Sequence, residues 1–261
     1  MKYFIHQHCF KFTYLYLFIF LATLNPANAQ SIQSKISNGL STFDFPTVAK
    51  ITVFGEDKVG SCSATLIGCQ TALTAAHCVC EDDATGLSCQ PGRTDHIPPQ
   101  NVRVLFQNSP PRGVIDIKVP SNYEFGKGAD IALLTLSTPV TGIRPVSLNN
   151  AMKPPFGTVG TIVGFGRSAD ELSDTGVKRQ GQIITTSCPV APGLGQVPNS
   201  EFLCWQFNSS TGPTQASVCS GDSGGPVFIT QGGNLTLAAN HSLATVDCND
   251  NNSLPGTSAS S

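Results

Sequence analysis

The sequence predicts an all-β fold, a barrel or a sandwich, and three observations lead to this prediction. The 261 residues include 25 glycines and 18 prolines, which favour many turns. Short runs rich in β-branched and aliphatic residues recur between turn signals, as expected of successive strands. Residues 36–261 contain no sustained helical period, internal repeat or low-complexity linker.

The expected strands are short, and they are spread over most of the chain. Each is a run of β-branched or aliphatic residues bounded by Pro-Pro, Pro-Gly, Asn-Gly or Gly-Gly pairs or by other turn residues. The candidates are 48–54, 102–106, 114–119, 131–136, 158–165, 182–186 and 227–230. The polar stretch 81–100 is expected to be a surface loop.

Composition excludes some classes of protein. The formal net charge is −2 and the sequence has no basic block, so nucleic acid is not an expected partner. Charged residues make up only 12% of the chain, but 40% of it is hydrophobic, which is enough for a buried core. Ten cysteines are many for a cytosolic enzyme and indicate an oxidising compartment.

The N-terminus has the pattern of a secretory signal peptide over residues 1–29. Lys2 and Lys11 are followed by an apolar stretch, 12–24, and by a small-residue cleavage site, Ala-Asn-Ala at 27–29. The alternative is a membrane anchor, but the apolar run is shorter than the ~20 residues needed to span a bilayer. We therefore expect a secreted protein, periplasmic if the source is bacterial, with no membrane association after cleavage.

Three short motifs contain a histidine, an aspartate and a serine, in that order. Residues 74–78 are Thr-Ala-Ala-His-Cys, residues 130–134 are Asp-Ile-Ala-Leu-Leu, and residues 221–226 are Gly-Asp-Ser-Gly-Gly-Pro. Taken singly, they would be a packed core histidine, a turn or cap aspartate and a tight turn. Taken together, they closely resemble the trypsin/chymotrypsin family of serine endopeptidases, and the resemblance extends from residue 36 to about residue 256.

The resemblance implies two six-stranded Greek-key β-barrels of the chymotrypsin type with the active site between them. It implies that Ser223 attacks the peptide carbonyl, that His77 is general base and then general acid, and that Asp130 orients the imidazole. The N–H groups of Gly221 and Ser223 would form the oxyanion hole. Protein or peptide substrates are expected, and neither a cofactor nor a metal.

Residues 35–39, Lys-Ile-Ser-Asn-Gly, resemble the activation junction of the family. Cleavage after Lys35 would free the amino group of Ile36, which in the family turns inward and pairs with the aspartate beside the nucleophile, here Asp222. This implies a propeptide at 30–35, a peptidase domain at 36–261, and an activating protease and protein inhibitors as partners. The alternative is that Lys35 is only an exposed linker residue.

The resemblance also locates a specificity pocket. Trypsin-like members have an aspartate six residues before the nucleophile, where this sequence has Ser217, so a preference for Lys or Arg is not expected. The expected pocket residues are Ser217, Val218, Ser242, Ala244 and Gly256. Their size and neutrality predict cleavage after medium apolar or small aliphatic residues. The alternative, that variable loops determine specificity, stays open.

Three disulfides are implied by the resemblance: Cys62–Cys78, Cys188–Cys204 and Cys219–Cys248. Cys69, Cys80 and Cys89 are left over. Two of them would pair and one would stay free or form an intermolecular bond, while their spacing matches no zinc pattern. Glycosylation sequons begin at Asn208, Asn234, Asn240 and Asn251 and apply only to a eukaryotic source.

The sequence departs from the family at two places. Phe165 stands where the family has a tryptophan, and Pro255-Gly256 is followed by five small or polar residues where the family has a strand and a helix. We therefore expect the last strand and helix to be missing or replaced. The alternative function is a weak or inactive binding protein on the same fold, and a monomer is expected in either case.

Overall fold

The computed structural model describes residues 36, 39–55, 59–80, 96–150, 152–168, 172–191, 195–207 and 215–244. Residues 33–261 group into one unit. The expected signal peptide, the propeptide with Lys35, Cys89, Cys248, Gly256 and the chain end lie outside the described residues, so these expectations remain predictions. No helix in the described ranges is both long and apolar enough to cross a membrane.

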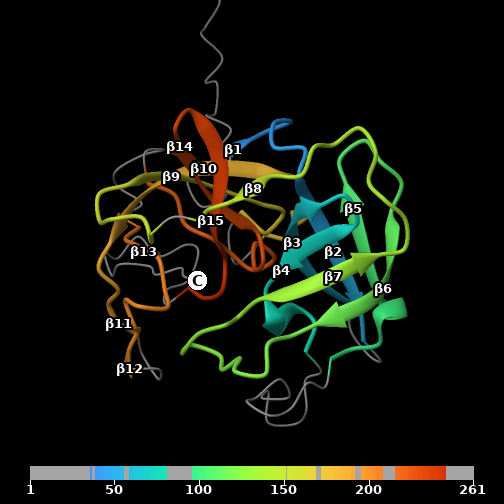
Figure 1. Cartoon of the computed structure of the whole chain (residues 1–261), viewed down its shortest axis with the longest axis horizontal. Coiled ribbons are helices and arrows are strands. Elements are labelled where there is room, and N and C mark those ends of the chain that lie inside the picture. Colours follow the sequence, from blue (N-terminus) through green and yellow to red (C-terminus); the bar gives the residue numbers. More distant parts are fainter. Residues whose placement is uncertain are drawn as a thin grey trace, which may run out of the picture. The chain divides into compact units, whose positions relative to one another are not determined.

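The first half is a closed six-stranded antiparallel barrel (Figure 1). Its strands follow the order β2-β3-β4-β7-β6-β5, and β5 pairs back to β2 to close the ring. The bounds are β2 Val48–Phe54, β3 Val59–Gly68, β4 Thr71–Thr74, β5 Val102–Phe106, β6 Arg112–Lys118 and β7 Ala132–Leu136.

Alternating burial shows which face of each barrel strand points inward. In β5, Val102, Val104 and Phe106 are fully buried, whereas the intervening Arg103 and Leu105 are exposed. The same two-residue period in β7 buries Ala132, Leu134 and Leu136. These side chains belong to one core cluster that fills the barrel. The barrel therefore forms a rigid support for the loops at its ends.

The second half is a seven-stranded sheet in order β1-β10-β9-β14-β15-β8, with β13 paired to β10 (Figure 1). Within the described residues this sheet is open, where a second closed barrel was expected. The edge pairing of β15 with β8 is parallel. The bounds are β1 Leu40–Ser41, β8 Ser147–Leu148, β9 Val159–Gly164, β10 Arg179–Thr186, β13 Cys204–Trp205, β14 Pro226–Gln231 and β15 Asn234–Asn240.

Short elements complete the described part of the chain. A hairpin joins β11, Val190–Ala191, to β12, Gly195–Gln196. The two 3₁₀ helices are η1, Ala76–Cys78, and η2, Pro99–Asn101. The fold is thus nearly all β, as predicted, and the only described helical turn in the motif regions is η1, which carries His77.

Candidate active site

His77 lies on η1, directly after the barrel strand β4. Ala75 and Ala76 precede it and are fully buried, so the turn packs tightly against the barrel end. The His77 side chain remains 26% exposed. A buried backbone with a partly exposed imidazole leaves one edge of the ring open toward solvent or a bound molecule.

Asp130 lies in the segment that leads into β7, and it meets His77 across the barrel end. Its Oδ2 atom is 2.7 Å from His77 Nδ1, and its Oδ1 atom accepts the His77 backbone N–H at 3.0 Å. The two contacts fix both the ring and the backbone of the histidine. Since Nδ1 faces the carboxylate, the proton of a neutral ring belongs on Nδ1, and Nε2 is left as an acceptor.

Two residues of the second half also hold Asp130. Ser242 Oγ donates to Asp130 Oδ2 at 2.5 Å, and Asn240 Nδ2 donates to the Asp130 backbone oxygen at 3.1 Å. Burial of Asp130, which is 1% exposed, acts to raise the pKa of its carboxyl group. The His77 charge and the hydrogen bonds from His77 and Ser242 outweigh burial, so the pKa is lowered and the carboxylate stays ionised.

These contacts change how two sequence features are interpreted. Ser242 was expected in the pocket wall, but its hydroxyl is bound to Asp130. Asn240 begins a glycosylation sequon, yet it is 1% exposed and its amide is bound inside the site. A glycan cannot be attached to Asn240 in this fold. No sequence signal pointed to either contact, because both depend on packing between the two halves.

Ser223 lies in a tight turn that precedes β14. Gly221 and Gly224 flank it with φ values of 99° and 79°, a backbone region that favours glycine. The Ser223 carbonyl accepts the Ser63 N–H from the barrel at 2.8 Å, and the Gly224 N–H donates to the His241 carbonyl in the second half at 2.7 Å. The turn is therefore held by both halves of the fold.

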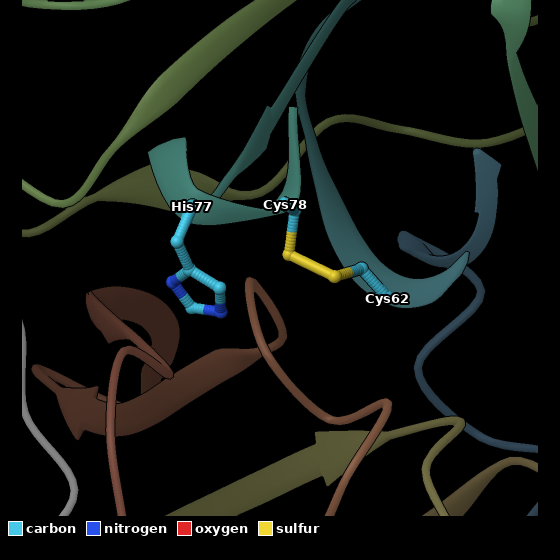
Figure 2. A group of neighbouring side chains, drawn as sticks. All are labelled: Cys62, His77 and Cys78. Carbon is cyan, nitrogen blue, oxygen red and sulfur yellow. A yellow bond between two sulfur atoms is a disulfide. The ribbon is translucent and has the colours of Figure 1, made fainter. Parts of the chain in front are cut away.

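The donor groups near Ser223 are available to a bound molecule. Among the described residues, the N–H groups of Gly221 and Ser223 have no acceptor. No hydrogen bond joins the His77 ring to the Ser223 hydroxyl in the described part of the chain, and such bonds often tighten only when substrate binds. Figure 2 shows the His77 ring beside the Cys62–Cys78 disulfide.

Asp222 is fully buried beside the nucleophile candidate. Its carboxylate accepts the N–H groups of Gly166, at 2.8 Å, and Cys219, at 2.9 Å. Burial raises the pKa of Asp222 to about 7, against the effect of these two bonds. Ile36 is also buried, 1% exposed, in the core cluster of the second half.

The cysteines separate into bonded and free positions. The structure contains the disulfides Cys62–Cys78, which ties the His77 turn to β3, and Cys188–Cys204. Cys80 and Cys219 are each in a disulfide whose partner lies outside the described residues, whereas Cys69 is exposed and free. The ligand atoms of Cys62, His77 and Cys78 lie within 4.8 Å of one another. Because the two sulfurs are bonded to each other, they offer no thiolate to a metal.

The expected pocket residues have different environments. Ser217 is 3% exposed and Val218 is 5% exposed, whereas Ala244 is exposed to solvent. Phe165, at the family's tryptophan position, is buried between the two halves. His241 was missed by the sequence analysis: it is 1% exposed, its ring contacts Trp205, and within the described ranges neither ring nitrogen makes a hydrogen bond of normal geometry, although the Val163 backbone lies near the ring.

Comparison with known proteins identifies the family of this chain. A sequence profile described as Trypsin matches residues 40–260. The chain belongs to the trypsin family. This trypsin-family chain is 28% identical to "Serine protease SSP1" of Scolopendra subspinipes over 250 residues, which cover 89% of this chain and 84% of the relative.

Two further relatives illustrate the range of the family. "Fibrinolytic enzyme, isozyme C" of Lumbricus rubellus is 32% identical over 196 residues, covering 66% of this chain and 72% of the relative. "Trypsin" of Saccharopolyspora erythraea is 26% identical, covering 70% and 75%. This trypsin-family protein is accordingly a serine-type endopeptidase that acts on protein substrates.

Proposed function

We propose that this protein is a secreted serine endopeptidase that works through His77, Asp130 and Ser223 and an acyl-enzyme intermediate. The observation that carries the proposal is the pair of contacts from Asp130 to the His77 ring and backbone, 2.7 and 3.0 Å long. Such a pair is what a hydroxyl nucleophile needs, because the base must be held in one tautomer and one orientation. The sulfur of Cys78, the residue after His77, lies 3.7 Å from the Ser223 carbonyl oxygen.

The first step transfers one proton and forms one bond. Ser223 Oγ attacks the substrate carbonyl carbon while its proton passes to His77 Nε2. Asp130 remains ionised and stabilises the imidazolium, consistent with the lowered pKa of its carboxyl group. Collapse of the intermediate breaks the C–N bond, and His77 returns the proton to the leaving amine. Water then attacks the ester carbon by the same two steps, and the bond to Ser223 Oγ breaks.

The negative oxygen of each tetrahedral intermediate needs donors. The Gly221 and Ser223 N–H groups fill this role in the proposal, since neither has an acceptor among the described residues. Losing one such donor typically costs ~10²–10³ in turnover.

Cleavage after Lys35 is the proposed activation step. It would create an ammonium group on Ile36, whose side chain already packs in the core of the second half. Asp222 is fully buried and forms no ion pair with a described residue, although the charge of Arg179 acts on it, so it would then gain a direct counter-charge. This pairing would order the Ser223 turn.

The proposed P1 preference is non-tryptic. Ser217 and Val218 are buried and uncharged, so this region offers no carboxylate to Lys or Arg. Neutral walls favour a medium apolar or small aliphatic side chain, which gains free energy by leaving water.

The test is covalent labelling with a fluorophosphonate probe. The full chain is treated before and after cleavage by a Lys-specific protease, and the adduct is mapped by mass spectrometry. We expect an adduct on Ser223 that appears when Ile36 becomes the N-terminus, and none in S223A. A soluble, folded protein with a free Ile36 and no adduct would overturn the proposal in favour of a binding protein.

A further inference from the structure

A cavity of about 310 Å³ lies away from the His77–Asp130 pair, between the end of β5 and the start of β10. Its walls come from both halves of the molecule and are mostly apolar, with Phe43, Leu105, Phe106, Phe165 and Val177 among them. The volume is at the lower end of the range of small-molecule sites, enough for one large side chain. We call this cavity the Lys178 pocket.

Among the described residues that line this pocket, Lys178 is the one cation, and only 4% of it is exposed. Its Nζ atom donates to the Phe45 carbonyl at 3.1 Å, and no carboxylate forms an ion pair with it among the described residues. Burial lowers the pKa of Lys178 to about 8, against the attraction of Asp44. Lys178 lines the pocket and an ammonium group has three N–H donors, of which the Phe45 carbonyl accepts one, so this largely apolar pocket offers a positive charge to an anion.

The pocket is directly connected to the segment that holds Asp222. Phe165 forms part of its wall, and the next residue, Gly166, donates its N–H to Asp222 Oδ1 at 2.8 Å. Arg179, which follows Lys178, donates to the Gly166 carbonyl at 3.0 Å and pairs with Asp174 at 2.8 Å. A ligand in the pocket would therefore press on residues one position away from the support of Asp222.

We propose that the Lys178 pocket binds a peptide C-terminus, with the last apolar side chain against the aromatic walls and the free carboxylate on Lys178. The choice of this occupant rests on the proposed function. An endopeptidase with an apolar P1 preference releases products that end in an apolar residue bearing a new carboxylate, and this is the chemistry that the pocket complements. The site is thus a product-binding site separate from the catalytic centre.

The test compares N-acetyl-leucine with N-acetyl-leucinamide, which differ only in the carboxylate. Binding to the intact chain is followed by ¹⁵N NMR on the backbone signals of Thr42, Val177 and Lys178. We expect the acid to bind with a Kd of about 1 mM or below, and the amide about tenfold or more weakly. The Gly166 signal should shift together with the pocket signals, because its N–H reports the link to Asp222.

The matched variants are K178M, which removes the amine and keeps an apolar chain, and K118M, which removes an exposed lysine, 74% accessible, elsewhere. K178M should abolish the preference for the acid, and K118M should leave it unchanged. Equal binding of acid and amide to the wild type, or binding of neither at about 10 mM, would overturn the inference without any variant. Ser223 labelling is measured separately, so a failed pocket and a failed peptidase are distinguishable.

Discussion

At Asp130, burial and hydrogen bonding act on the same carboxylate in opposite directions. The side chain is almost fully buried, yet His77 and Ser242 both donate to its Oδ2 atom and lower its pKa. The Ser242 bond comes from the second half of the molecule, whereas His77 and Asp130 belong to the first. The ionisation of Asp130, which holds the proposed catalytic base His77, therefore depends on the packing of the two halves.

Replacing Ser242 with alanine should weaken catalysis without removing it. One donor to an ionised carboxylate contributes about 1.5–3 kcal/mol, so S242A is expected to lower kcat/KM by about 10- to 100-fold. The loss should also raise the pKa of Asp130 and move the acidic limb of the pH–rate profile upward. S121A, at an exposed serine, is the control. An unchanged pH profile in S242A would show that the bond does not set the state of Asp130.

The residues of this site were predictable from the sequence to different degrees. His77 and Asp130 stand in motifs whose order indicates chemistry, and the structure brings them into contact. Ser242 and Asn240 carry no such signal, because their partners are 112 and 110 positions away in the chain. The assignment of Ser242 to the pocket wall stays a prediction, but nothing in the sequence indicated that its hydroxyl is bound to Asp130.

His241 gives a second prediction at this scale. Burial lowers its pKa to about 3, although the Val163 backbone opposes the effect, so the folded protein keeps it neutral. The unfolded chain binds a proton near pH 6.5, so the stability associated with this histidine is present above that pH and is lost as pH falls toward 3. The difference is at most on the order of 5 kcal/mol. H241V should flatten this part of the curve of unfolding free energy against pH, measured by urea denaturation, and an unaltered slope would contradict it.

At the scale of elements, the turn around Ser223 depends on close backbone contact with β3 and β4. A Cβ atom on Gly224 would lie 2.1 Å from Thr74 Oγ1 and 2.5 Å from the Ser63 carbonyl. Both neighbours are buried parts of the first barrel. The glycine is therefore needed for space as well as for its positive φ.

Two alanine substitutions can separate these requirements. Gly224 and Gly233 have nearly equal φ values, 79° and 80°, but a Cβ on Gly233 meets no atom of the described residues within 4 Å. G233A should cost only about 1 kcal/mol of stability, the backbone penalty alone. G224A should cost about 2–4 kcal/mol and abolish Ser223 labelling, because the turn must move off the barrel. Equal costs in thermal unfolding would disprove the steric argument.

The strands were predicted best where apolar residues alternate or run together. The expected strands 48–54 and 102–106 match β2 and β5, since their side chains mark the barrel interior. β3 and β15 were not among the expected strands: in β3 the first valine is followed by Gly, Ser and Cys, and in β15 two leucines alternate with Asn, Thr and Ala. Pairing with neighbouring strands, and not intrinsic propensity, determines that these segments are extended.

For the whole molecule, the charge balance of the interior should change on activation. In the intact chain, burial raises the pKa of Asp222 to about 7, so the folded state holds a proton that the unfolded state releases near pH 3.8. The associated stability is present below about pH 4 and is lost as pH rises through 7, a change on the order of 4 kcal/mol. After cleavage, the Ile36 ammonium should lower the pKa of Asp222 and reverse this loss.

The measurement is urea denaturation of intact and cleaved protein between pH 4 and 8. The cleaved form should gain stability relative to the intact form as pH rises, and D222N should remove the pH dependence of the difference. The effects of His241 and Asp222 on stability oppose each other between about pH 4 and 6.5. A single curve of unfolding free energy against pH therefore does not separate them, and the comparison of intact and cleaved protein is needed. A constant difference between the two forms at all pH values would refute the pairing.

The position of the Ser223 turn has a consequence for the order of folding. Its carbonyl is bound by Ser63 in one half, and the next N–H is bound to His241 in the other. Neither half can fix this turn by itself, so Ser223, the proposed nucleophile, is positioned only when the two halves dock. During refolding, the reactivity of Ser223 should therefore return only after the first barrel has formed. Labelling of Ser223 would then measure the docking of the two halves, a late step of folding.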